Sequence, residues 1–230
     1  MNELDRYQSA PVVAEQPRAK RMSARMFNLT VSGLIFIGFC VMALGSYATS
    51  TLVFYKLFAS SGLGLMLGMF AGSIAGLIMM SVAAGRQSAG LSIAGFALFV
   101  SSFGLTASIG LAMYDLPTIN TAFAATAGIT LVFGTLGMLF PSFFSKAMGV
   151  VTGCLFGVII VELVLMFMGV PQTVLDYAVV AIFAFFIAFD TYKATQVEPT
   201  LPNAVLAASN LFVDIVNVFL RILDIIGRKN

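Results

Sequence analysis

The sequence contains no histidine and no tryptophan, only two cysteines among its 230 residues, and charged side chains at only 10% of its positions. Histidine is the commonest metal ligand and a frequent general base, so a chain without it and without clustered cysteines offers no familiar metal or catalytic constellation. Cys40 and Cys154 both lie inside apolar runs and predict no disulfide framework. We therefore expect no enzyme, no resident cofactor and no nucleic-acid partner.

Hydrophobic residues make up 60% of the chain, and its charged fraction is far below the roughly 25% of a typical soluble domain. Seven apolar segments have close to the ~20 residues that a membrane-spanning helix needs. They cover residues 26–48, 63–84, 90–113, 121–140, 147–169, 175–191 and 204–226. Turn-forming sequences such as GRQS, YDLPTIN, PSFFSK and EPTLPN separate them. The sequence predicts an all-α polytopic membrane protein with a seven-helix transmembrane domain over residues 26–230.

Residues 1–25 are polar, and we expect a flexible basic tail there because Pro11 and Pro17 oppose a continuous helix. The basic residues of the tail are Arg6, Arg18, Lys20, Arg21 and Arg25. Basic residues concentrate on the cytoplasmic side of membrane proteins. With a cytoplasmic tail and seven spans, eight basic residues lie inside and three outside, leaving Arg221 within the last segment uncounted. We therefore expect a cytoplasmic N-terminus. The basic residues do not decide whether the last segment crosses the membrane or enters it and returns to the same side.

The last apolar segment carries a stripe of polar side chains at helical spacing. The stripe consists of Asn210, Asp214, Asn217, Arg221, Asp224 and Arg228. Spacings of three and four residues place all six on one helix face. Charged groups inside a membrane normally face a protein interior or an aqueous cavity, so we expect this helix to stand inside the bundle with a pore-facing stripe. An amphipathic helix lying on the membrane surface is the alternative.

Two aspartates lie in or beside apolar runs, Asp190 in FDTYKATQ and Asp214 in LFVDIVNVF. Each is twelve residues from Pro202 in the turn sequence EPTLPN, so an antiparallel helix pair brings them to a similar depth. Two carboxylates close together in a low dielectric tend to share one proton, and a basic side chain or a hard cation such as Ca²⁺ can take its place. We expect a proton- or cation-responsive pair, with two separate structural caps as the alternative. Glu162 is a possible accessory acid, although a structural bond to a hydroxyl or an arginine is the interpretation that we favour.

Several stretches resemble the Bax-inhibitor family, the transmembrane Bax inhibitor motif proteins. FDTYKATQ is similar to the DTQ-type motif of that family, and SNLFVDIVNVFLRILDIIG resembles its final helix, with Phe212 where the family usually has tyrosine. FVSSFGLTASIG and FGTLGM resemble its third and fourth helices. The resemblance is to a bacterial-type member, which implies a location in the inner membrane of the cell.

The resemblance implies six helices that surround a central seventh, and a pH-sensitive leak of Ca²⁺ across the membrane. It also implies that a pair of aspartates on the last two helices senses pH and binds the cation, and these map onto Asp190 and Asp214. In some bacterial members an arginine near the end of the second helix bonds this pair and closes the pore. A rough alignment places that arginine near Ala84, and Arg86 is the nearest candidate for such a latch.

Three functions are compatible with these features. The one that we expect is a cation leak channel, with Ca²⁺ as the transported ion, gated by protonation of the aspartate pair. A proton-coupled transporter that uses the same acids as a relay is the first alternative. A non-conducting regulator that binds other membrane proteins is the second. In each case the lipid bilayer is a partner, and protons and Ca²⁺ are partners in the first.

Overall fold

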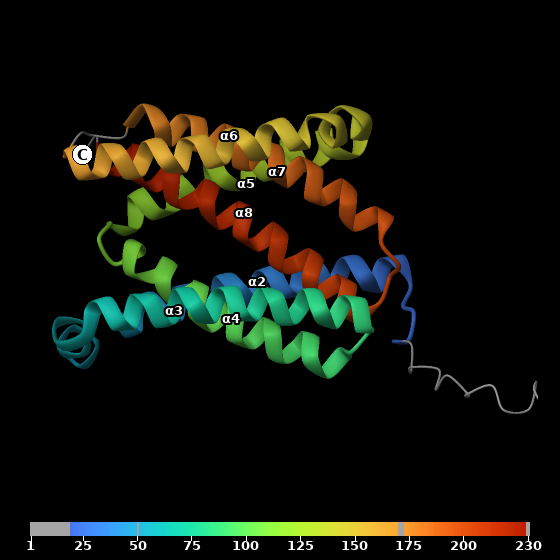
Figure 1. Ribbon diagram of the computed structural model, residues 1–230, viewed down its shortest axis with the longest axis horizontal. Coiled ribbons are helices and arrows are strands. Elements are labelled where there is room, and N and C mark those ends of the chain that lie inside the picture. The colour runs from blue at the N-terminus through green and yellow to red at the C-terminus, as the bar shows by residue number, and fades with distance from the viewer. Residues whose placement is uncertain (1–18, 50, 170–172, 229–230) are drawn as a thin grey trace, which may run out of the picture.

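The computed structural model describes residues 19–49, 51–169 and 173–228, which fold into α-helices joined by short connections (Figure 1). The helices are α2 (Ala24–Thr49), α3 (Leu52–Arg86), α4 (Ala89–Leu111), α5 (Leu116–Leu139), α6 (Pro141–Met168), α7 (Thr173–Gln196) and α8 (Leu201–Gly227). These ranges contain no β-strand, and an isolated antiparallel bridge joins Arg21 to Thr200. The predicted all-α class is confirmed.

Each of the seven described helices is long and apolar enough to cross a membrane. Their candidate spans contain between 23 and 29 residues. A helix satisfies its backbone hydrogen bonds within itself, which is what a segment surrounded by hydrocarbon must do. The chain is therefore a multi-pass integral membrane protein, and the seven predicted segments are confirmed.

Several helix boundaries differ from the prediction, most of all the starts of α3 and α6. Helix α3 begins at Leu52, well before the predicted segment, and bends at Ser61, whose φ of −146° and ψ of 28° are not helical. The sequence PSFFSK was predicted to be a break, and this is wrong, because it forms the start of α6. Pro141 lies in the first turn of that helix. Backbone N–H groups in the first turn have no acceptor within the helix, so the absence of an N–H in proline costs no hydrogen bond there, and its fixed φ suits the helix.

The stretch before α2 is attached to the linker between α7 and α8. The backbone N–H of Met22 donates to the Pro199 carbonyl with an N···O distance of 2.8 Å, and Arg21 forms an ion pair with Glu198. The final part of the predicted tail is thus bound to the helical domain. Helix α2 begins at Ala24, within the residues that were predicted to form the tail. The rest of that tail, residues 1–18, lies outside the described ranges.

Helix α8 runs diagonally between two groups of helices in Figure 1, with α5, α6 and α7 on one side and α2, α3 and α4 on the other. It packs against α2, α3, α4, α5 and α7. A larger share of its apolar stretch is buried than in any other described helix, whereas α6 has none of its apolar stretch buried. These observations agree with an interior α8. A complete ring of six helices around it stays a prediction.

Aromatic side chains of neighbouring helices pack around Phe212 and cover the apolar face of α8. The Phe212 ring is fully buried and makes edge-to-face contacts with Phe39, Phe99 and Phe103 at centroid distances of 5.3, 6.2 and 6.0 Å. A Cβ atom on Gly38 of α2 would lie 2.7 Å from this ring, so α2 approaches α8 this closely only with glycine there. The apolar half of α8 is therefore covered by neighbouring helices, and its polar half faces elsewhere.

A glycine also lets α5 and α7 approach each other. A Cβ atom on Gly137 would come to 1.9 Å from the backbone oxygen of Ala188 in α7. An alanine at this position has to push the two backbones apart. We expect Gly137→Ala to lower the free energy of unfolding by about 1–3 kcal/mol, measured by thermal or denaturant unfolding in detergent micelles.

Gly128 in the same helix provides the matched control. No atom lies within 4 Å of the position that a Cβ atom would take there. Alanine has the higher helix propensity, so Gly128→Ala is expected to leave stability unchanged or to raise it by up to about 1 kcal/mol. Equal losses of stability in the two variants would contradict a special requirement for glycine at the α5–α7 contact.

Candidate functional site

Asp190 of α7 and Asp214 of α8 bring two carboxyl groups together inside the helical bundle. The two carboxyl groups lie close enough to interact with each other. Asp214 is buried, with 5% of its surface exposed, and Asp190 is half-buried. Ionised carboxylates only accept hydrogen bonds, so this contact is a hydrogen bond only while one of the two groups carries a proton. A role of the pair in sensing pH or binding Ca²⁺ stays a prediction.

The turn between α7 and α8 does not lie where the sequence analysis placed it. Helix α7 ends at Gln196, and Pro202 belongs to the first turn of α8, a position that accepts proline. Asp190 lies six residues before the end of α7, whereas Asp214 lies thirteen residues after the start of α8. The difference corresponds to about 10 Å of helix. The two helices are therefore joined asymmetrically by a short extended linker, and the carboxyl groups still meet.

Asp190 borders a small cavity of mixed polar and apolar lining on the side of this linker. A cavity of about 50 Å³ between the end of α7 and the first half of α8 is lined by Asp190, Lys193, Asn203 and Asn210 among others. Lys193 attracts Asp190 electrostatically, and its Nζ atom lies 5.8 Å from the centre of the Phe189 ring. Asn210, the first residue of the predicted stripe, thus lies on the side of α8 that faces the aspartate pair.

Arg86, the candidate latch, is the last residue of α3, and its side chain is exposed. It lines a surface cavity together with Lys20 and Arg21. Within the described ranges, no ion pair joins it to Asp190 or to Asp214. In this conformation the aspartates meet without an arginine between them, and the latch role of Arg86 stays a prediction.

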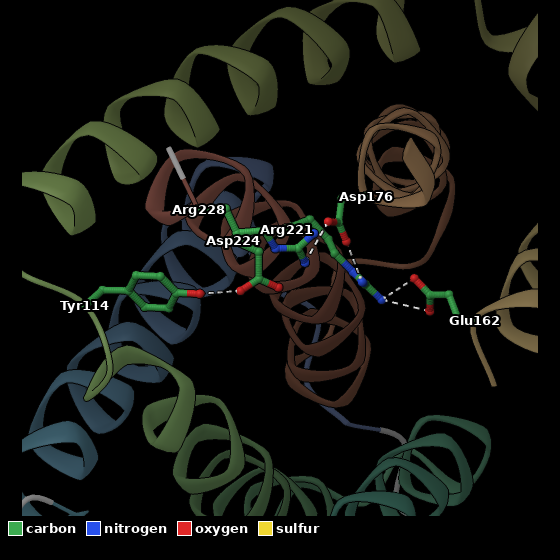
Figure 2. Close-up of polar contacts among 6 residues, drawn as sticks. All are labelled: Tyr114, Glu162, Asp176, Arg221, Asp224 and Arg228. Atoms are coloured by element: carbon green, nitrogen blue, oxygen red, sulfur yellow. Dashed lines mark hydrogen bonds and ion pairs between the residues drawn. The ribbon is translucent and has the colours of Figure 1, made fainter. Parts of the chain in front are cut away.

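A second polar cluster joins α6, α7 and α8 near the other end of α8 (Figure 2). Arg221 of α8 lies between Asp176 of α7 and Glu162 of α6, with N···O distances of 2.8 and 2.9 Å. Arg228 reaches the second oxygen of Asp176 at 3.0 Å. Asp176 is completely buried, and a buried charge without partners is strongly unfavourable, so the two arginines stabilise it. Glu162 has an arginine partner, as its structural interpretation required.

Asp224, a further member of the predicted stripe, accepts a hydrogen bond from the hydroxyl of Tyr114 at 2.5 Å. Tyr114 belongs to the short connection between α4 and α5. Burial, reinforced by the bond to Asp224, raises the pKa of Tyr114 to about 12, so its hydroxyl remains a neutral donor near pH 7. A Cβ atom on Gly227 would lie 2.1 Å from the tyrosine ring, which fixes the end of α8 against this connection. The sequence analysis missed Tyr114, because a tyrosine in a connection carries no periodic signal.

The contacts between α7 and α8 share one register. Asp176 lies fourteen residues before Asp190, and Arg228 lies fourteen residues after Asp214, as two antiparallel helices in contact require. The sequence analysis also missed Asp176, because an acid in the first turn of a helix is already explained by the helix dipole. The signal was nevertheless present, since the register that pairs Asp190 with Asp214 pairs Asp176 with Arg228.

Most of the polar face of α8 points toward α7. Asp214, Arg221 and Arg228 contact acids of α7, while Asn217 bonds within its own helix by donating from Nδ2 to the Val213 carbonyl at 2.8 Å. In the described part of the chain, no group of three or more His, Cys, Asp or Glu side chains is arranged to hold a metal ion. The arrangement can hold charges inside the bundle and exchange a proton at one carboxyl pair.

The cluster around Asp176 gives a prediction about stability. Asp176→Asn keeps the shape of the side chain but removes the charge that stabilises Arg221 and Arg228. We expect a loss of about 2 kcal/mol in the free energy of unfolding, between the values for exposed and for buried ion pairs, because the arginines are partly exposed. Glu198→Gln, which removes the exposed ion pair with Arg21, should cost no more than about 1 kcal/mol. Unfolding in detergent compares the two variants, and an equal effect would argue against a structural role for the cluster.

Comparisons with known proteins place the chain in a family. The family model described as "Inhibitor of apoptosis-promoting Bax1" matches residues 19–230. Inner membrane protein YbhL of Escherichia coli K12 is 23% identical over 239 residues, which cover 98% of this chain and 100% of YbhL. An uncharacterized protein of Borreliella burgdorferi is 26% identical over 226 residues, 93% of this chain and 97% of its own. An uncharacterized membrane protein of Streptococcus pyogenes serotype M3 is 26% identical over 171 residues, 70% of this chain and 75% of its own. Because the family match covers almost the whole chain, this protein is a membrane-embedded member of the Bax-inhibitor family.

Proposed function

We propose that this protein is a cation leak channel that passes Ca²⁺ and is gated by protonation of the Asp190–Asp214 pair. The observation that carries the proposal is the contact between two carboxyl groups on neighbouring helices, each long and apolar enough to span the membrane. Acids within membrane segments are rare and often mark ion or proton pathways. Apolar side chains at both positions would avoid the desolvation of two carboxyl groups, so the acids favour a role in transport over one in packing.

Protonation controls the contact because it decides whether the two groups attract or repel each other. With one proton between them, the carboxyl groups form a hydrogen bond that joins α7 to α8. With both groups ionised, two like charges 4 Å apart repel by about 4 kcal/mol at an effective dielectric constant of 20. A change of this size is large enough to shift an equilibrium between two helix arrangements.

The chemistry of the pair suits a hard cation that binds briefly. Carboxylate oxygens are the ligands that Ca²⁺ prefers, and Ca²⁺ takes about six to eight of them. Asp190 and Asp214 together supply at most four carboxylate oxygens, and no third acid joins them within the described ranges. A partial ligand set of this kind favours transient occupancy during passage over storage.

A difference between two levels of the α7–α8 pair supports a gate at Asp190. Attraction between Asp176 and the arginines joins the helices at the start of α7 and the end of α8, whereas the carboxyl contact near the middle of α8 would depend on a shared proton. A small cavity beside Lys193 lies between Asp190 and the first residues of α8. With a cytoplasmic N-terminus this end faces the cytoplasm of a bacterial cell, and we propose the inner membrane as the location, by analogy with the printed name of YbhL.

The proposal predicts that the pair sets the pH dependence of ion flux. Purified protein in liposomes, with a Ca²⁺ gradient and an internal Ca²⁺ indicator, should show passive flux that changes with pH. Asp190→Asn and Asp214→Asn each remove one titrating carboxyl, so each variant should conduct with a flat pH profile. Glu198→Gln, which changes an exposed acid, should keep the wild-type profile.

Three outcomes separate the channel from other functions. Flux down the Ca²⁺ gradient without a proton gradient supports the channel. Flux that requires protons moving the other way identifies a coupled transporter, and absence of flux in a folded, reconstituted protein leaves a regulator that binds other membrane proteins. Wild-type pH profiles in both aspartate variants would refute gating by the pair.

A further inference from the structure

A large cavity whose lining does not include Asp190 or Asp214 lies at the end of the bundle where α2, α4 and α8 begin and α3 ends. Its volume is about 860 Å³. The four helix ends meet at the right-hand side of Figure 1. The proposed channel mechanism makes no use of this cavity, so its lining residues call for a separate explanation.

Three basic side chains from two separate segments line the cavity. Lys20 and Arg21 precede α2, and Arg86 ends α3. No aspartate or glutamate belongs to the lining, and Glu198, outside it, forms an ion pair with Arg21. Among the described residues, no acid forms an ion pair with Lys20 or Arg86. Within the described part of the chain, the cavity therefore has two basic side chains without an acidic partner.

The surrounding backbone adds to this positive potential. Ser23 and Ser88 belong to the lining and cap the N-termini of α2 and α4, whose dipoles favour an anion. The end of α3 has the opposite dipole, but two carbonyls of its last turn, those of Ala83 and Ala84, accept hydrogen bonds from the backbone N–H groups of Ser88 and Gln87. The cavity is thus suited to an anion for two independent reasons, the basic side chains and the helix termini.

Apart from Gln87, the rest of the lining is apolar and favours an anion that also has an apolar part. Met22, Met26, Ala89 and Leu201 contribute to it. Because candidate membrane spans start or end at this level, the cavity lies where lipid headgroups meet acyl chains. Basic pockets between membrane helices at this depth suit acidic lipid headgroups. A free phosphate would use the charges and leave the apolar lining uncovered.

We propose that this cavity binds an acidic glycerophospholipid, with its phosphate against Lys20 and Arg86 and its glycerol and upper acyl chains against the methionines. The site is independent of the proposed channel activity. It gives Arg86 a role at the membrane interface, which agrees with its exposed position and its separation from the aspartate pair.

Native mass spectrometry of the full-length protein in detergent tests the site with phosphatidylglycerol and phosphatidylcholine, which share a phosphate but differ in net charge. We expect tighter binding of phosphatidylglycerol to the wild type. The double variant Lys20→Gln/Arg86→Gln should weaken it by about tenfold or more, because a charged hydrogen bond to phosphate contributes roughly a factor of ten. Binding of phosphatidylcholine should change little.

The control is Lys56→Gln/Lys146→Gln, which removes the same charge from exposed positions outside the cavity and should retain wild-type binding. Unfolding temperatures measured without added lipid verify that both double variants are folded. If Lys20→Gln/Arg86→Gln is not folded, the single variant Lys20→Gln replaces it in the binding measurement. Equal affinity of the wild type for the two lipids, or equal losses in the two double variants, would overturn the proposal. Displacement of the lipid by millimolar glycerol 3-phosphate would also overturn it, because the ligand would then be a free phosphate.

Discussion

The desolvation of charged side chains in lipid is the constraint on which this structure depends. Hydrocarbon offers a charge neither water nor a partner, so a helix such as α8 can cross a membrane only with its polar face turned toward protein. The apolar half of α8 packs around Phe212 against α2 and α4, and the polar half meets acids of α7. The separation of α8 into an apolar face and a polar face therefore explains both its position in the bundle and its register against α7.

The two helices satisfy the same constraint by different means at two levels, one near the end of α8 and one near its middle. At one end two arginines surround the buried Asp176, an attraction that persists as long as the carboxylate is ionised. Near the middle of α8, Asp214 meets Asp190, and two ionised carboxylates at this contact would repel each other unless one carries a proton. The proposed gating by protonation depends on this difference between the two contacts.

Much of this arrangement could be predicted from the sequence, because apolar run lengths report spans and equal spacing reports the register of two antiparallel helices. The helix boundaries were predicted wrongly where one residue type, proline, occurs both in turns and at helix starts. Pro141 and Pro202 were taken as breaks, although proline also starts helices. Asp176 and Tyr114 were not singled out, because their partners Arg228 and Asp224 lie far away in the sequence and no local pattern encodes such tertiary contacts.

Cysteine accessibility along α8 tests most directly whether its polar face lines an internal path. In a background with Cys40 and Cys154 replaced by alanine, single cysteines at Asn210 and Asn217 should react with small water-soluble thiol reagents in liposomes, while those at the fully buried Phe212 and Val216 should be protected. Rapid labelling of Asn210 and Asn217 by bulky impermeant reagents would place α8 on the membrane surface. Equal labelling of both faces would likewise contradict an interior helix with one polar side.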